Sequence, residues 1–261
     1  MPYHFCRFVH RGQQKYGVLL DGTIVEAEAV SPTEYRPSDR AVDPAEIEWL
    51  PPVTPSKIVA VGANYHSHAE EMGRPLPPEP MLFLKPSTAT IGHEGEIVYP
   101  AQSERVDFEG ELAVVVGRHA HNVSLGDAPQ HVLGYTVLND VTARDLQARD
   151  IQFTRAKSFD TFCPLGPYLV TELDPGDLRI TTRLNGRVMQ QGTTADLEHG
   201  VYELVSYISQ VMTLLPGDVI ATGTPRGVGP MQIGDTVEVE IDGIGLLRNR
   251  VVAGSTADEE D

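Results

Sequence analysis

Three acidic residues stand beside apolar runs that are typical of buried strands. Glu109 and Glu111 lie two residues apart before Leu112-Ala-Val-Val-Val116, and Asp140 follows Tyr135-Thr-Val-Leu-Asn139. Residues i and i+2 of a strand point to the same face, with Cα atoms roughly 6.6 Å apart. Two neighbouring carboxylates are costly unless a cation lies between them. Oxygen ligands favour a hard ion such as Mg²⁺, Mn²⁺ or Ca²⁺.

A solvated strand face paired with lysine or arginine is the alternative for these acids. The valine-rich continuation of the first strand argues against such exposure. Two glutamates and one aspartate leave about three positions for water or substrate on a six-coordinate ion. We therefore predict an open, catalytic metal site at Glu109, Glu111 and Asp140. A closed structural Ca²⁺ site is a further interpretation, although the sequence has no EF-hand-like acidic loop.

A second group of candidates lies in Asn64-Tyr-His-Ser-His-Ala-Glu-Glu71. On a helix, His68 and Glu71 are three residues apart and face each other. A carboxylate beside an imidazole fixes its tautomer and raises its basicity, so His68 could take a proton from water. His66 competes for the same role. The alternative is that His68 and Glu71 have no catalytic role and form a surface capping interaction on a short helix.

Two further features could bind an anion. Lys157, between aromatic residues, could neutralise a substrate carboxylate or an enolate, and the alternative is an exposed lysine with a packed stem. The turn Ala221-Thr-Gly-Thr-Pro-Arg-Gly-Val-Gly-Pro230 could hold a carboxylate with its backbone N–H groups and the Thr224 hydroxyl. It matches neither a Walker A loop nor Gly-x-Gly-x-x-Gly, and it could equally be a turn shaped only by glycine and proline.

Composition narrows the class of protein. The 261 residues carry a formal charge of −17, which argues against nucleic acid or an anionic membrane as partner but not against an anionic substrate. No apolar run approaches the length of a membrane span, and the first residues do not resemble a signal peptide. The two cysteines, Cys6 and Cys163, lie in no motif, which favours a reduced, cytoplasmic protein and argues against cysteine catalysis.

The elements that must position these residues are mostly strands. Asp21-Gly22 and Asn185-Gly186 predict tight hairpins, and residues 141–150 and 201–215 predict helices, the second of them packed in the core. No regular alternation of strands and helices is present, so we predict a mixed, β-rich α+β fold. The proline-rich stretch at 50–55 divides a small N-terminal β domain (1–52) from a catalytic domain (53–253), and an acidic tail (254–261) follows.

Six strings in this chain together resemble the fumarylacetoacetate hydrolase family. The strings are Asn64-Tyr65-x-x-His68-x-x-Glu71, Phe83-Leu84-Lys85-Pro86-Ser87, Glu109-x-Glu111-Leu-Ala, Asn139-Asp140-Val-Thr-Ala-Arg144-Asp145-x-Gln147, Ala156-Lys157-Ser158-Phe159 and Thr222-Gly-Thr-Pro-Arg-Gly-Val-Gly229. They follow the family order over about residues 57 to 252. Each string alone is weak, but six in order are specific. The first 52 residues are similar in kind to the small domain of many bacterial members.

The resemblance implies a sandwich-like β roll as catalytic domain, usually in a homodimer. It implies Mg²⁺ or Mn²⁺ on the three acids. It places five residues around a 2-oxo acid substrate, namely Lys157, Arg144, Gln147, Gly223 and Thr224. It also makes His68 and Glu71 a water-activating pair on a lid that orders when substrate binds.

The chemistry that the family implies is reaction through a metal-bound enolate of a 2-oxo or 2,4-dioxo carboxylate. Water delivered by His68 would hydrolyse the C3–C4 bond of an acylpyruvate. Without that water, the same enolate serves decarboxylation of an oxaloacetate-type acid or isomerisation of a 2-hydroxyhepta-2,4-diene-1,7-dioate-type acid, and fold alone does not choose among them. The histidine–glutamate pair favours hydrolysis. The alternative from another class is a catalytically silent protein that binds 2-oxo acids.

Overall fold

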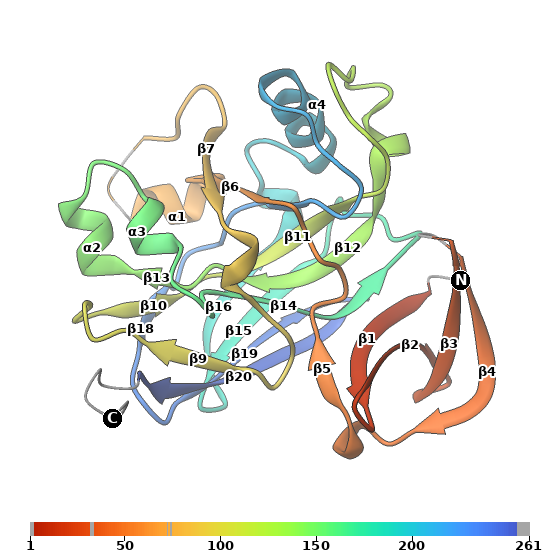
Figure 1. The fold of residues 1–261 in the computed structure, drawn as a ribbon. Coiled ribbons are helices and arrows are strands. Elements are labelled where there is room, and N and C mark those ends of the chain that lie inside the picture. Colours follow the sequence, from red (N-terminus) through yellow and green to blue (C-terminus); the bar gives the residue numbers. More distant parts are fainter. Residues whose placement is uncertain (1–2, 32–33, 72, 74, 255–261) are drawn as a thin grey trace.

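Strands make up most of the structure, which confirms the predicted β-rich α+β class (Figure 1). The computed structural model describes residues 3–31, 34–71, 73 and 75–254. Apart from Gly254, the predicted acidic tail lies outside the described residues. The strands form sheets of twelve, five and three strands.

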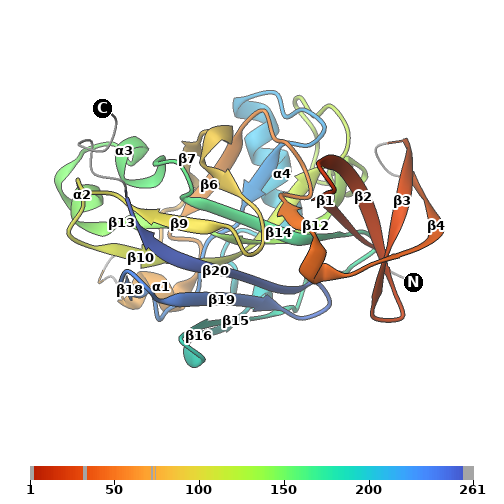
Figure 2. The ribbon, with the colours of Figure 1, turned by 60° about the horizontal axis from the view of Figure 1, so that its bottom comes forward.

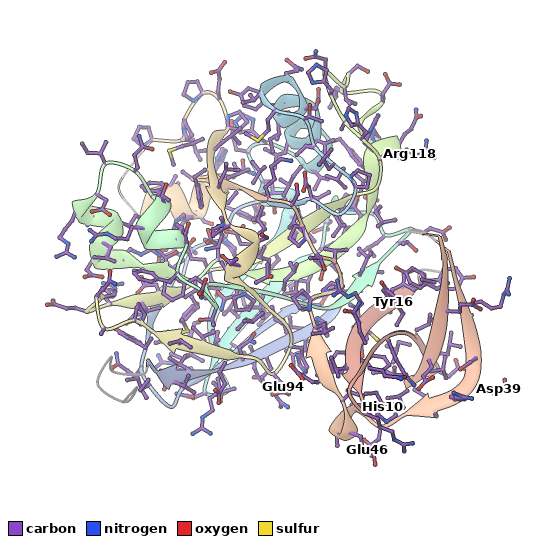
Figure 3. The ribbon with its side chains drawn as sticks, viewed as in Figure 1. His10, Tyr16, Asp39, Glu46, Glu94 and Arg118 are labelled. Carbon is purple, nitrogen blue, oxygen red and sulfur yellow. The ribbon has the colours of Figure 1, made fainter. Side chains whose placement is uncertain are left out.

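The first fifty residues form five strands with a small core of their own. They are β1 (His4–His10), β2 (Gln13–Leu20), β3 (Thr23–Ser31), β4 (Glu34–Val42) and β5 (Glu48–Leu50). The predicted hairpin at Asp21-Gly22 is confirmed, because both residues have positive φ, 48° and 79°, and Leu20 pairs with Thr23. At the outer end of this unit, His10 Nε2 lies 3.8 Å from Glu46 Oε2 (Figure 3). Strand β1 then pairs with β14 and joins the unit to the large sheet.

The large sheet carries the segments that matter for the site. Its order is β4-β3-β2-β1-β14-β12-β11-β17-β6-β7, with β5 and β8 paired to β1 and β14. The strands after the N-terminal five are β6 (Ile58–Gly62), β7 (Met81–Lys85), β8 (Thr90–Ile91), β11 (Gly110–Val116), β12 (Val132–Asn139), β14 (Cys163–Val170) and β17 (Val219–Ala221). Every residue of β11 is buried, which explains why its sequence is continuously apolar after Glu111.

A five-stranded sheet packs against this large sheet and closes the main core (Figure 2). Its order is β16-β15-β19-β20-β9. Its strands are β9 (Glu96–Tyr99), β15 (Arg179–Leu184), β16 (Arg187–Thr193), β19 (Thr236–Ile241) and β20 (Gly245–Ala253). Asn185-Gly186 forms the predicted hairpin between β15 and β16. The third sheet consists of β13 (Thr142–Ala143), β10 (Val106–Phe108) and β18 (Gly229–Met231).

The helices are short, and three of them cluster at one end of the large sheet (Figure 1). They are α1 (His66–Glu71), α2 (Arg144–Arg149), α3 (Thr154–Lys157) and α4 (Val201–Val211), with 3-10 turns η1 (Pro44–Glu46), η2 (Ser87–Ala89), η3 (Ala128–His131) and η4 (Thr194–Asp196). Within the described ranges, none of the helices has the length and apolarity needed to cross a bilayer.

Two predicted helix boundaries were wrong for tertiary reasons. The helix expected over 141–150 begins only at Arg144, because Thr142 and Ala143 pair with β10. The helix expected over 201–215 ends at Val211, and Leu214 instead forms a bridge to Ala120. Its predicted packing in the core is confirmed by the burial of its apolar face.

A buried carboxylate fixes the start of two site-bearing strands. Asp218 accepts hydrogen bonds from the backbone N–H and hydroxyl of Ser56 (3.1 and 2.6 Å), from the N–H of Lys57 (3.2 Å) and from the N–H of Leu215 (2.8 Å), and it pairs with the Lys57 ammonium. Directly after it, β17 runs parallel to β6 from the pair Val219–Ile58. Asp218 thus holds the residues just before β6 beside the start of β17 and sets the register of this pair. Both strands lead into loops of the site.

We expect Asp218→Asn to lower the free energy of unfolding at pH 7 by about 2–4 kcal/mol, because an amide cannot accept from all these donors or balance Lys57. Burial alone would raise the pKa of Asp218, but hydrogen bonds from Lys57, Ser56 and Leu215 outweigh it and lower the pKa. The contribution is therefore complete above the ordinary carboxyl pKa of about 4 and is lost as the pH falls through the lowered value.

Urea unfolding from pH 7 downward measures this effect. The gap in stability between wild type and Asp218→Asn should close in acid, while a change at exposed Asp160, Asp160→Asn, should leave stability at pH 7 within about 0.5 kcal/mol of wild type. A gap that stays constant with pH would contradict the assignment of the stabilisation to the charged carboxylate.

Candidate active site

The three predicted carboxylates converge where β11 pairs with β12. Glu109 lies between β10 and β11, Glu111 is on β11, and Asp140 follows β12. Gly110 pairs with Asn139, the Glu109 N–H donates to Asn139 Oδ1 (2.9 Å), and the Asp140 N–H donates to the Glu109 carbonyl (2.8 Å). All three acids are buried, and one oxygen from each lies within 4.8 Å of the others. The sequence spacing thus brings together the predicted ligand set.

Glycine between the two glutamates lets the sheets approach. A Cβ built on Gly110 would lie 2.3 Å from Thr182 Oγ1 and 2.9 Å from a methyl group of Val239, both on the five-stranded sheet. Such contacts are closer than packed atoms can tolerate. Position 110 therefore requires glycine for its space, and the close approach buries the carboxylates on either side of it.

Basic side chains surround two of the three acids. Lys157 Nζ donates to Glu109 Oε2 (2.8 Å) and Asp140 Oδ2 (2.7 Å), Lys85 Nζ donates to Asp140 Oδ1 (2.6 Å), and Arg144 pairs with Glu109. Burial would raise the pKa of Glu109, but Lys157 and Arg144 hold it well below the usual range. Burial would likewise lower the pKa of Lys157, but Asp140 and Glu109 raise it. Lys157 is therefore charged although buried.

Glu111 lacks this compensation. Its Oε2 accepts a hydrogen bond from the Gly223 N–H (2.8 Å), and in the described part of the chain no basic side chain forms an ion pair with it. Burial, together with Asp140 and Glu109, raises its pKa well above the usual value. A third buried carboxylate without a paired cation, facing two others, is the donor set that a hard divalent ion fits. The residues present therefore suit Mg²⁺ or Mn²⁺.

Helix α1 brings the predicted base to the same cleft. His68 lines the cleft with the three acids, and its Nδ1 lies 3.4 Å from Glu71 Oε2. Both Glu71 oxygens also accept from the Gly227 N–H (3.0 Å). His66 instead faces Glu198 outside the cleft, with Nε2 3.0 Å from Oε2. The geometry thus separates the two histidines that the sequence left as alternatives.

Arg144, Gln147, Lys157 and Thr224 also line the cleft, whose cavity volume is about 70 Å³. This is far below the roughly 300–1,000 Å³ of pockets for drug-sized ligands, so the cavity suits a small acid. The lining residues are Val61, Gly62, Ala63, His68, Ala69, Met81, Phe83, Glu109, Glu111, Asp140, Arg144, Gln147, Phe153, Lys157 and Thr224. Gly223 is held beside it by its bond to Glu111.

Comparison with known proteins identifies the family. The model of the fumarylacetoacetate hydrolase C-terminal domain matches residues 57–252, and an "Rv2993c-like, N-terminal" model matches residues 3–52. The chain belongs to the fumarylacetoacetate hydrolase family. The resemblance carried by the six sequence strings is thereby confirmed.

Members of the family similar to this chain carry different activities in their names. Human mitochondrial oxaloacetate tautomerase FAHD2A is 45% identical over 80% of this chain and 70% of its own length. The structure of a 2-hydroxyhepta-2,4-diene-1,7-dioate isomerase from Mycobacterium marinum is 42% identical, with a TM-score of 0.89 over 97% of this chain and all of that one. Fumarylpyruvate hydrolase from Pseudomonas aeruginosa, solved with Mn²⁺ and pyruvate, is 34% identical, with a TM-score of 0.74 over 83% and 93%.

In this family member, the glycine-rich loop binds the protein's own carboxylates. The N–H groups of Gly223 and Gly227 donate to Glu111 and Glu71 respectively, and the Thr224 hydroxyl donates to the Gly110 carbonyl (2.9 Å). The loop therefore orients a predicted ligand and the partner of the predicted base. The expected contacts of Gly223 and Thr224 with substrate stay predictions.

Sequence reasoning missed Gln190, which joins this loop to β11, the strand that carries the predicted ligand Glu111. Its side chain is fully buried; Oε1 accepts from the Gly110 N–H (3.0 Å), and Nε2 donates to Thr224 Oγ1 and the Pro225 carbonyl (both 2.8 Å). Lys85 was present in a family string but had no assigned role. The sequence signal for Gln190 is weak, since the next residue on β16 is also a glutamine, Gln191, and is exposed. Only the contact between distant segments reveals it.

We expect Glu111→Gln to weaken Mn²⁺ binding by about 100-fold, because a neutral amide replaces the one carboxylate that no lysine or arginine compensates. Titration calorimetry or the electron paramagnetic resonance signal of free Mn²⁺ measures the dissociation constant without any assay of activity. Glu71→Gln is the matched control, since Glu71 contacts His68 and none of the three acids. The Mn²⁺ affinity of this variant should stay within about threefold of wild type. Equal affinities for all three proteins would remove Glu111 from the ligand set.

Proposed function

We propose that this protein is a divalent-metal-dependent enzyme that hydrolyses the C3–C4 bond of small acylpyruvates. The observation that carries the proposal is the position of His68, paired with Glu71, on the wall of a cleft that also holds three converging carboxylates. Such a pair supplies a positioned general base. Family membership supports an enzyme that handles 2-oxo acids, and the proposal adds the reaction.

The charges at the site support an anionic substrate. Five carboxylates lie among four basic side chains, namely Glu71, Asp107, Glu109, Glu111 and Asp140 with Lys85, Arg105, Arg144 and Lys157. With all nine ionised, the net charge is −1, so a bound dication would leave a surplus of one positive charge. The carboxylate of a 2-oxo acid would restore neutrality.

The mechanism assigns distinct work to the residues around the substrate. Glu109, Glu111 and Asp140 would hold Mg²⁺ or Mn²⁺, which supplies a Lewis acid for the 2-oxo group. Glu71 accepts a hydrogen bond from the Nδ1–H of His68, which leaves Nε2 free to take a proton from water.

The hydroxide that His68 generates attacks the C4 carbonyl, and the C3–C4 bond breaks to give a carboxylic acid and pyruvate. Lys157, held charged by Glu109 and Asp140, stabilises the negative charge that develops on the departing pyruvate. The proton taken by His68 returns to C3 of that product. Water is thus consumed, and no other co-reactant is required.

Proton transfer without hydrolysis is a second candidate function. Its support is the 45% identity to an oxaloacetate tautomerase and the 42% identity to a diene-dioate isomerase. The same His68 would then move a proton at C3 of the substrate, with no water delivered to C4. The two candidates share the site and differ only in what the base deprotonates.

We expect His68→Gln to lower kcat for acylpyruvate hydrolysis by about 10²–10⁴-fold, because glutamine cannot accept the proton of water. Binding of Mn²⁺ should persist in this variant. The control is His66→Gln, since His66 lies against Glu198, and its kcat should stay within about twofold of wild type. Release of pyruvate from acylpyruvates, followed with and without EDTA, gives the rates.

The outcomes separate the candidates. Full turnover after complete metal removal, or unchanged hydrolysis by His68→Gln, would refute the proposed mechanism. Tautomerisation of oxaloacetate that depends on His68, without release of pyruvate from any acylpyruvate, would favour the second candidate. Binding of 2-oxo acids with no turnover in either assay would indicate a silent binding protein.

A further inference from the structure

One face of β7 changes from charged to apolar along the cleft. Met81, Phe83 and Lys85 alternate along the strand and so share a face, and they pair with Gly62, Ala60 and Ile58 of β6. Lys85 is fully buried on Asp140 (2.6 Å), whereas Met81 is 39% exposed. The face therefore runs from the carboxylates to solvent over roughly 13 Å, at about 3.3 Å per residue.

The middle of this face is aromatic. The Phe83 ring centroid lies 5.2 Å from Lys157 Nζ, so the ring begins where the charged part of the site ends. Phe153, from the segment between α2 and α3, packs edge-on against Phe83 with centroids 5.7 Å apart and planes at 81°. Both rings border the cleft together with Met81. These three side chains, called here the apolar wall, are the part of the lining that lies beyond the ammonium group.

A close approach of backbone to side chain seats Met81 in this wall. A Cβ built on Gly62 would lie 2.4 Å from Met81 Cε, so the methyl group occupies the space that a side chain at position 62 would need. Val61 and Ala69, both buried, complete the apolar lining on the neighbouring elements. The glycine thus allows an aliphatic group to lie against the cleft.

The basic residues that line the cleft are already engaged by protein groups. Arg144 donates to Asp107 (2.9 Å) and to Gln147 Oε1 (2.7 Å) and pairs with Glu109. Lys157 is shared between Glu109 and Asp140. Among the described lining residues, neither cation is left to pair with a second substrate carboxylate. A carboxylate against the apolar wall would lose hydration without a compensating partner.

We infer that the substrate carries an uncharged, apolar acyl group, a short alkyl chain, against Met81, Phe83 and Phe153, and that the site selects against a terminal carboxylate. The inference rests on the proposed function, because the acyl group is the part of an acylpyruvate beyond the bond that breaks. The inferred substrate, with a single carboxylate, differs from the 1,7-dioate in the name of the Mycobacterium marinum relative.

The test uses two acylpyruvates of equal carbon number, 2,4-dioxoheptanoate and 2,4-dioxoheptane-1,7-dioate. We expect kcat/KM to be at least about tenfold higher for the first, since a pocket contact of this size typically discriminates 10–200-fold. Met81→Lys places a cation in the apolar wall and should shift the ratio by about tenfold or more toward the 1,7-dioate. Leu84→Lys is the matched control: it adds the same charge to the other face of β7, where Leu84 is 47% exposed, and should leave the ratio unchanged.

A binding experiment makes the inference independent of turnover. Titration calorimetry of the Mn²⁺-loaded protein compares N-propyloxamate with N-(2-carboxyethyl)oxamate, which share a 2-oxo acid-like end and differ in tail charge. Failure to cleave either acylpyruvate would refute the proposed hydrolysis, while tighter binding of the propyl compound would still support the apolar wall. A preference for the carboxylated member of either pair, or an equal effect of Leu84→Lys and Met81→Lys on the ratio, would overturn the inference.

Discussion

The structure depends on keeping three carboxylates buried within a few ångströms of one another. Burial makes each charge costly, and proximity makes each additional charge more costly. The chain offsets this with Lys85 and Lys157 from other segments, and it leaves Glu111 with the Gly223 N–H. In the proposed metal-bound enzyme, folding and metal binding would act on the same oxygens, and a dication would complete a compensation that the side chains begin.

The elements around the acids can be understood through that requirement. The β11–β12 pair sets the acids side by side, and Gly110 lets the second sheet cover them. Asp218 aligns the two parallel strands that lead to the glycine-rich loop and to α1. Gln190 ties that loop back to β11. Each contact joins segments remote in sequence, so the geometry of the site is a property of the whole sandwich.

Local patterns predicted the parts of the site that depend on short spacing. The His68–Glu71 pair on a helix and the two glycine hairpins follow from the period of helix and turn. The i, i+2 spacing correctly placed Glu109 and Glu111 at one cleft, although Glu109 lies just before β11 and not in it. The rest depends on partners that no local pattern contains. The helix after Asp140 starts late because Thr142 and Ala143 pair with β10, and His66 is held outside the cleft by Glu198, 132 residues further on. Gln190 carried no usable signal for the same reason.

The register of strand β7 positions both Lys85, beside the acids, and the apolar wall. Its sequence, Met81-Leu-Phe-Leu-Lys85, is apolar on both faces except for the lysine, so the pattern alone does not say which face meets the cleft. Pairing with β6 decides it. A shift by one residue would turn Lys85 away from Asp140 and replace Phe83 with a leucine, so compensation of the acids and the apolar wall would be lost together. A single strand register thus fixes both the charge beside the three acids and the polarity of the wall at which we place the tail of the proposed substrate.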